Sequence, residues 1–257
     1  MIKTTQNFCF STLAFNEKYR LMAKQISQEL QKYAPEIVLI VGTDQPKDFD
    51  NLSNVIAFEL RQKGILHCYH DKRFVVEKAL SMYDVAIQID ADINIVDFPP
   101  QNLDYLPSII GGTEENMINH VQKYTPERLI HIEKVASKLG LDLSKAQYIG
   151  ESLMIFSRDN GKEKDFLHYW GEIGTYLELK GIHAGSGNAI GLAALKIGWT
   201  IERNQDWETI HKLAVHFDAS QKIKKTSWEQ FQRRLAYHYR LNKTRLKALG
   251  NFSFYYG

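Results

Sequence analysis

The stretch Val85-Ala-Ile-Gln-Ile-Asp90-Ala-Asp92 is an apolar, strand-like run that ends in two carboxylates separated by one alanine. Side chains alternate between the two faces of a strand, so Asp90 and Asp92 can share a cation only if the chain turns at Ala91. Mg²⁺ and Mn²⁺ take few protein oxygens and keep positions for water and phosphate. The pattern therefore predicts a divalent-cation site at a strand end, with a merely solvated acid pair as the alternative.

Strand and helix patterns alternate along the chain on both sides of this run. Apolar runs and three-to-four-residue periodicity predict strands at 8–13, 36–41, 54–60, 65–69 and 153–157, and helices at 17–33, 73–82, 114–124, 126–139, 162–179, 189–196 and 228–249. Continuously apolar strands are typical of parallel sheets buried on both faces. We therefore expect an α/β fold, with a mostly parallel, mixed central sheet flanked by helices and a basic C-terminal helix.

The composition is that of a globular protein. With 257 residues, of which 44% are apolar, the chain can bury a full core, and one domain with decorations is the preferred organisation. No apolar run approaches the roughly 18 to 20 residues of a membrane span, and the N-terminus has no basic segment followed by an apolar one. We therefore expect a cytoplasmic protein. Cys9 and Cys68 lack CxxC spacing and are predicted to be free, buried thiols.

Positive charge is concentrated near the C-terminus. Residues 221–250 contain nine lysines and arginines and one glutamate, a local charge of +8 in a chain whose total is +2, so the remainder carries −6. The nine cations are Lys222, Lys224, Lys225, Arg233, Arg234, Arg240, Lys243, Arg245 and Lys247. This asymmetry predicts an anionic partner, which can be a diphosphate, an anionic membrane surface or a nucleic acid.

Three consecutive segments together resemble a known block. They are Tyr69-His-Asp-Lys-Arg-Phe, the helix with Glu77-Lys-Ala-Leu80, and the strand that runs from Tyr83 to Asp92. Over about 25 residues this order resembles the central block of nucleotide-sugar glycosyltransferases of the GT-A fold, where the strand ends in the DxD motif. The resemblance is specific for the superfamily and not for a substrate.

This resemblance implies a GT-A-like nucleotide-sugar-binding and catalytic domain at 1–220, with 221–257 as a basic helical extension packed on it. It also implies that Asp90, Ala91 and Asp92 hold Mn²⁺ or Mg²⁺ against a donor diphosphate. A UDP-sugar is the expected donor, and the acceptor is a hydroxyl of an unidentified glycan, lipid or small molecule.

A second local match lies near the C-terminus. Leu213-Ala-Val-His216-Phe-Asp, followed by Lys224-Lys225 and Trp228, is similar to a segment of retaining galactosyltransferases. The similarity implies that His216 is a third metal ligand, that Lys224 or Lys225 contacts the diphosphate, and that retention is favoured over inversion. An ordinary strand histidine with solvated lysines is the alternative.

Further donor contacts are expected from position. Lys72 and Arg73 at a helix start can reach a donor phosphate or orient the sugar, although a solvated basic pair fits equally well. The resembling fold places the nucleoside after the first strand, and ligands of such sheets bind at the carboxyl ends of strands. The candidates there are Ser11, Thr12, Ala14 and, after the second strand, Asp44.

Two glutamates are candidates for the chemistry of transfer. A carboxylate near the anomeric centre can act as a base toward the acceptor or stabilise developing positive charge. Glu151, in a loop before a strand, is the better candidate, because Glu172 lies at helical spacing and can be a surface residue. The segment His183-Ala-Gly-Ser-Gly187-Asn188 can bring backbone amides to an anion or sugar, or can simply form a tight turn.

Three rival classes are less well matched. A haloacid-dehalogenase-like phosphatase also has a strand that ends in DxD, but it carries the motif near its N-terminus and needs a later acidic GDxxxD-type pair, which is not found here. A sugar nucleotidyltransferase needs a glycine-rich loop after the first strand, and 11–16 contains no glycine. A nucleic-acid-binding protein would use the basic tail, with Tyr237 and Tyr239, without a known binding motif.

Overall fold

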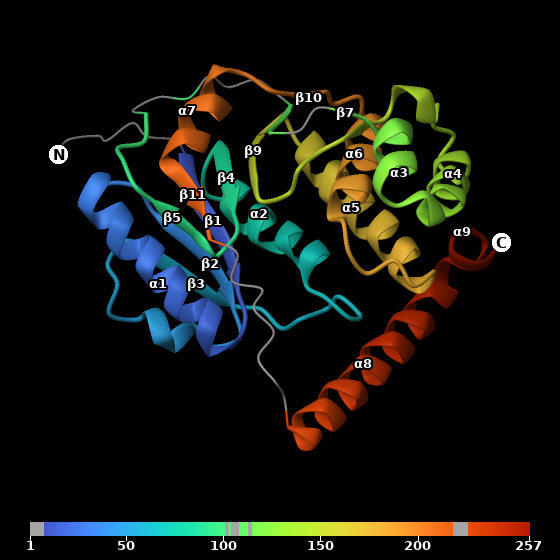
Figure 1. Cartoon of the computed structure of the whole chain (residues 1–257), viewed down its shortest axis with the longest axis horizontal. Helices are drawn as coiled ribbons and strands as arrows, with labels where there is room; N and C mark the ends of the chain where they lie inside the picture. The colour runs from blue at the N-terminus through green and yellow to red at the C-terminus, as the bar shows by residue number, and fades with distance from the viewer. Residues whose placement is uncertain (1–7, 101–102, 104–107, 113–114, 218–225) are drawn as a thin grey trace.

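A seven-stranded sheet forms the centre of the computed structural model, which describes the chain except for residues 1–7, 101–102, 104–107, 113–114 and 218–225 (Figure 1). In sheet order the strands are β10 Ile201–Glu202, β6 Ile109–Gly111, β9 Leu153–Ser157, β4 Val85–Ile89, β1 Phe8–Ala14, β2 Leu39–Thr43 and β3 Val55–Glu59. Strands β4, β1, β2 and β3 pair in parallel, as do β6 and β10.

Strand β9 alone runs antiparallel to both of its neighbours, β4 and β6. Its first residue, Leu153, pairs with Ile89, the last residue of β4. The start of β9 therefore lies at the edge where β1, β2 and β4 end. The expectation of a mostly parallel, mixed sheet is confirmed.

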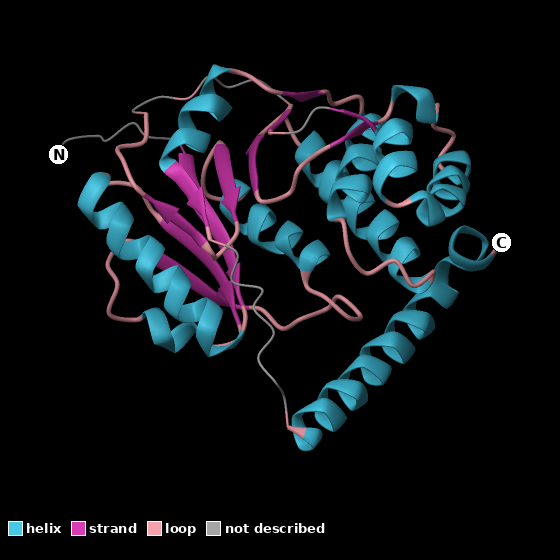
Figure 2. Cartoon of the chain, in the orientation of Figure 1, coloured by secondary structure: helices cyan, strands magenta, loops and turns pink. Residues whose placement is uncertain are grey.

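Helices cover both faces of the sheet (Figure 2). Alternation along the strands divides the core: in β1, Phe8 and Phe10 belong to one apolar cluster and Cys9 to the other. The first cluster packs under helix α1, Asn16–Tyr33, and α7, Gln205–Leu213. The second packs under α2 Lys72–Leu80, α3 Met117–Tyr124, α4 Leu129–Lys138, α5 Lys162–Leu179 and α6 Ser186–Ile197.

Helix α6 lies unusually close to the strand that precedes β9. A Cβ on Gly187 would lie 2.2 Å from the Ile149 carbonyl oxygen, and one on Gly191 would lie 1.9 Å from that of Gln147. Only glycine permits this approach. It joins α6 to a two-stranded sheet of β7 Glu115–Asn116 and β8 Gln147–Tyr148.

A second small sheet was not expected from the sequence. Strand β5, Ile93–Ile95, follows the Asp90–Asp92 turn and pairs antiparallel with β11, Ala214–His216. Both strands are only three residues long, so local periodicity does not reveal them. Their pairing brings residue 216 beside the end of β4.

The C-terminal helix α8, Ser227–Ala248, begins with a capping box formed by Thr226 and Glu229. Arg240 Nε donates a hydrogen bond of 3.1 Å to the Ile65 carbonyl, and Ala248 joins the core. Most other side chains of α8 are exposed. Helix α9, Phe252–Tyr256, ends the chain. No helix in the described residues has both the length and the apolar character to cross a membrane.

The predicted strand at 65–69 is wrong. This segment is a non-repetitive loop that leads into the 3₁₀ turn Tyr69–Asp71. Buried carboxylates fix its backbone: Asp71 accepts from the amide of Gly64, and Glu178 accepts from the amide of Ile65 at 2.9 Å. The other 3₁₀ turns are Pro46–Phe49, Pro126–Arg128, Leu143–Lys145 and Leu249–Asn251. Cys9 is buried, Cys68 is partly buried, and both are free thiols.

Candidate functional site

The DxD segment turns at Ala91, as a shared cation would require. The Ile93 amide donates to the Asp90 carbonyl at 3.2 Å, while the Asp90 amide donates to Ser152, just before β9, at 3.0 Å. Ala91 itself is buried, so a small residue is needed there. The turn anchors both carboxylates at the carboxyl edge of the sheet.

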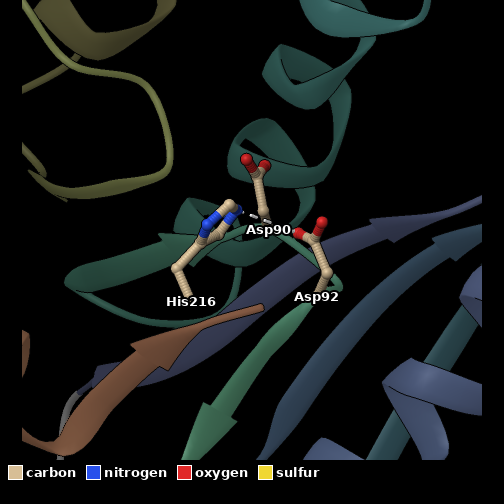
Figure 3. A group of neighbouring side chains, drawn as sticks. All are labelled: Asp90, Asp92 and His216. Carbon is tan, nitrogen blue, oxygen red and sulfur yellow. Dashed lines mark ion pairs between the residues drawn. The ribbon is translucent and has the colours of Figure 1, made fainter. Parts of the chain in front are cut away.

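The pairing of β5 with β11 brings His216 to the same place. His216 lies opposite Ile93, and the Phe217 amide donates to the Asp92 carbonyl at 2.8 Å. One ligand atom from each of Asp90, Asp92 and His216 lies within 4.8 Å of the other two, and His216 Nε2 is 3.4 Å from Asp92 Oδ1 (Figure 3). The structure thus assembles, from residues 124 positions apart, the group that the resemblance implied.

These three side chains fit a hard or borderline divalent cation. A cation bound at about 2.1 Å separates its ligand atoms by about 3 to 4 Å, so only small side-chain movements are needed to close the group. Two carboxylates and one imidazole suit Mn²⁺, and they leave open positions that phosphate oxygens or water can fill. The geometry is therefore that of a candidate metal centre with an open side.

Lys72, the first residue of α2, connects the metal group to β9. Its ammonium lies 2.5 Å from Asp90 Oδ1 and donates to the Glu151 carbonyl at 2.9 Å. Burial alone would lower the pKa of Lys72, but the negative charges of Asp90 and Glu151 raise it. The group therefore remains cationic at the place where a diphosphate would meet Asp90.

Glu151 lies at the same edge because β9 runs antiparallel. Burial raises the pKa of Glu151 despite the nearby Lys72 and the amide of Ser186 at the start of α6. Its Oε2 is buried without a hydrogen-bond partner among the described residues, and the same holds for Ser186 Oγ and Asn188 Oδ1. Unpaired buried polar atoms are costly, which marks this cluster as a place where a polar ligand can bind.

Two tyrosines near the carboxylates were missed at the level of sequence. Burial raises the pKa of Tyr19, with a further contribution from Asp92. Burial also raises the pKa of Tyr69, with Glu151 as the next cause. Tyr69 lies three residues before Lys72, so its place in the Tyr69-to-Phe74 segment could have marked it as a site residue. Tyr19, on α1, has no sequence feature that points to the site.

The expected nucleoside contacts take different positions. Ser11 is buried and donates to Gln88 Oε1 at 2.9 Å, and Ala14 is buried at the end of β1. Thr12 is also buried, with Oγ1 unpartnered among the described residues. Asp44, after β2, is exposed and accepts from Arg20 at 2.8 Å. Asp44 is therefore the accessible member of this set.

Arg73 and Glu172 belong to another part of the molecule. Both lie near Tyr255 of α9, whose phenol interacts with their charges. Arg73 also lies against Gly171 of α5, and Glu172 pairs with His168 at 3.4 Å. The structure does not bring either one into the Asp90 group. Lys224 and Lys225 lie outside the described residues.

Among known proteins, only solved structures resemble this chain. No family model matches the chain, and no curated protein matches it. Among solved structures, it is similar to the galactosyltransferase LgtC in complex with donor and acceptor sugar analogues, with a TM-score of 0.51 and 10% identity over 89% of this chain and 95% of that one. At this identity the likeness shows the fold alone, and the fold is GT-A-like.

Proposed function

We propose that the protein is a metal-dependent glycosyltransferase that moves a sugar from a nucleoside-diphosphate donor to an acceptor hydroxyl. The observation that carries the proposal is the convergence of Asp90, Asp92 and His216 at the carboxyl edge of a GT-A-like sheet. This edge is where open α/β sheets bind their ligands. The similarity to a galactosyltransferase structure supports the same class.

Asp90, Asp92 and His216 would hold the cation, Mn²⁺ or Mg²⁺. When bound, the cation neutralises charge on the departing diphosphate. Lys72, held against Asp90, supplies a second positive charge at that place. Fixed charges that are already oriented stabilise a leaving group without reorganisation. Lys224 and Lys225, which follow β11 in the sequence, are proposed as additional contacts of the diphosphate.

The unpaired atoms of Glu151, Ser186 and Asn188 are proposed to bind hydroxyls of the transferred sugar. Glu151 is the proposed catalytic carboxylate, since it lies beside Lys72 and at the edge that Asp90 also occupies. Glu172 is not proposed for this role, because it pairs with His168 on α5. We propose retention of anomeric configuration, because the sequence around His216 is similar to a segment of retaining galactosyltransferases.

The donor is proposed to be a UDP-sugar. Its nucleoside would lie between the ends of β1 and β2, where Asp44 can accept a hydrogen bond from the base or ribose. Thr12 offers an unpartnered hydroxyl near the end of β1. The acceptor can be a glycan, a lipid or a small molecule that carries a free hydroxyl.

The extension at 221–257 is proposed to touch an anionic membrane from the cytoplasmic side. Helix α8 presents exposed aromatic and apolar side chains together with its basic residues, including Trp228 at 64% and Phe231 at 54% exposure. Such a combination suits an interfacial helix. Binding to vesicles with anionic lipid, weakened by salt and by Trp228→Ser, would support this contact; equal binding by the variant would contradict it.

The function is tested by incubating the purified chain with Mn²⁺ and a panel of UDP-, GDP- and ADP-sugars, and by measuring release of the nucleoside diphosphate. We expect release from at least one UDP-sugar, and we expect a chelator to abolish it. Two parallel assays cover the rivals. Hydrolysis of a phosphomonoester without nucleotide release would favour a phosphatase, and salt-sensitive oligonucleotide binding without nucleotide release would favour a nucleic-acid-binding protein.

A further inference from the structure

A cavity of about 620 Å³ lies between the 59–64 segment, the start of α2, helix α5 and the C-terminal half of α8. Its volume is in the range of small-molecule sites. Six cationic side chains line it: Arg61, Lys63, Arg73, Arg240, Lys243 and Lys247. The last three recur at intervals of three and four residues and so share one face of α8.

Arg73 is the most unusual of these cations. Its guanidinium stacks on Phe74 at 3.9 Å from the ring centroid and is partly buried. Among the described residues it has neither a hydrogen-bond acceptor nor an ion-pair partner. Burial lowers the pKa of Arg73, although the group remains charged at neutral pH. A planar donor group with five N–H bonds is thus held at the cavity wall with nothing to receive them.

The acidic residues of the wall do not balance these charges. Asp71 is occupied by the amides of Lys63 and Gly64, and Glu178 by the amide of Ile65. Burial raises the pKa of Asp71 to about 6 and that of Glu178 to about 8, so Glu178 is mostly uncharged at neutral pH. Glu59, the third carboxylate, already pairs with Arg61 at 3.0 Å. The cavity is therefore strongly cationic.

We propose that this cavity is a second anion site, which binds a phosphate or diphosphate group independently of the Asp90 metal centre. Arg73 offers a fork of donors that matches phosphate oxygens, and Lys243 and Lys247 add point charges from α8. The cavity volume of about 620 Å³ suits one phosphorylated molecule of small size. The phosphate can belong to a soluble metabolite or to a lipid headgroup.

The test is calorimetric titration of the full chain with inorganic pyrophosphate, at low salt and with a chelator that removes divalent cations. We expect saturable binding to the wild type and a loss of affinity of at least about tenfold in Arg73→Gln and in Lys243→Gln. Arg245→Gln is the matched control, because it removes the same charge from α8 without lining the cavity. Asp92→Asn is the second control, since it alters the metal centre; neither control should change the affinity.

The proposal is overturned if wild-type binding is absent, if Arg245→Gln loses as much affinity as Lys243→Gln, or if Asp92→Asn loses as much as Arg73→Gln. Circular dichroism and thermal unfolding would verify that each variant is folded, and the Lys243 change, at an exposed position, guards against misfolding of Arg73→Gln. Vesicles that contain phosphatidic acid form the other arm. Competition by these vesicles for the pyrophosphate site identifies a lipid headgroup, and lack of competition identifies a soluble phosphate as the source.

Discussion

Lys72 and Arg73 are neighbours in the first turn of α2 and look alike in the sequence, but their surroundings differ. Lys72 is buried, lies 2.5 Å from Asp90 and donates to the Glu151 carbonyl. Arg73 lines the cavity between the 59–64 segment, α5 and α8, and its guanidinium stacks on the ring of Phe74. Lys72 is held by an ion pair and a hydrogen bond at the candidate metal centre, whereas the N–H groups of Arg73 have no acceptor among the described residues. Two adjacent residues in one turn of α2 therefore belong to two anion-attracting places of different construction.

The difference shows that partners, and not residue type, decide what a basic side chain can do. A buried cation with an ion pair and a hydrogen bond holds its neighbours in place, and its removal leaves an uncompensated charge. A cation without partners adds little to stability but is available to a ligand. We therefore expect mutation of Lys72 to lower stability, and mutation of Arg73 to lower the affinity for an anion with little effect on stability.

The largest effect is expected at the metal centre. Asp92→Asn should lower metal-dependent release of UDP from a UDP-sugar by about a hundredfold or more, about 2.7 kcal/mol, because the amide is a poorer ligand for the cation. Asp97→Asn is the matched control, since this exposed carboxylate lies beyond β5. Equal rates of UDP release in the two variants would contradict the proposal that Asp92 is a ligand of the cation.

The next effect contrasts the two cations directly. Lys72→Met should lower the free energy of unfolding by about 2 kcal/mol, less than for a fully buried pair because the Asp90 side chain is 28% exposed. Arg73→Gln should change it by less than about 1 kcal/mol, since the side chain has a ring stacking but, among the described residues, no hydrogen bond or ion pair to lose. Urea unfolding measures both, and added Mn²⁺ should restore part of the loss in Lys72→Met. Similar losses of unfolding free energy in Lys72→Met and Arg73→Gln would contradict the proposed difference between the two cations.

A smaller effect is expected from His216. Its side chain is 48% exposed, so it forms the outer side of the metal group. His216→Ala should weaken Mn²⁺ binding by about tenfold, about 1.4 kcal/mol, in a calorimetric titration. His238→Ala, on exposed α8, is the control, and neither change should affect pyrophosphate binding in the cavity. Wild-type Mn²⁺ affinity in His216→Ala would mean that the imidazole is not a ligand.

The smallest effect concerns Glu178 in the cavity wall. Because burial raises the pKa of Glu178 to about 8, its stabilising contribution is complete below its unfolded pKa and is lost as the pH rises through about 8. Unfolding free energy of the wild type should therefore fall by about 1 kcal/mol between about pH 7 and about pH 9. Glu178→Gln should flatten this slope, since its amide oxygen can still accept from Ile65. Parallel slopes in urea unfolding would contradict the assignment.

The sequence predicts the elements whose signal is local. The apolar run before Asp90 is β4, the turn at Ala91 is present, and the periodic segment at 17–33 is α1. The division of the chain at residue 220 remains a prediction. The error at 65–69 has a physical cause, since the buried carboxylate of Glu178, 113 positions away in the sequence, accepts a hydrogen bond from the amide of Ile65.

The candidate site was predictable only in part. Asp90 and Asp92 are visible as a strand-end pair, and the resemblance pointed to His216, but the pairing of β5 and β11 that joins them depends on contacts between distant segments. The sequence also treats Lys72 and Arg73 as equivalent. Their separation follows from which side of α2 faces Asp90 at the end of β4 and which side faces α5 and the cavity. No local pattern contains this information.

Calorimetric titration of UDP, with and without Mn²⁺, tests the central claim most directly. We expect saturable UDP binding to the wild type that strengthens with Mn²⁺, and loss of this metal-dependent gain in Asp92→Ala. The Arg73→Gln variant should retain the gain, because its cavity is separate from the metal centre. UDP binding that is undetectable in both conditions, or that is indifferent to Mn²⁺ and to Asp92, would contradict the claim.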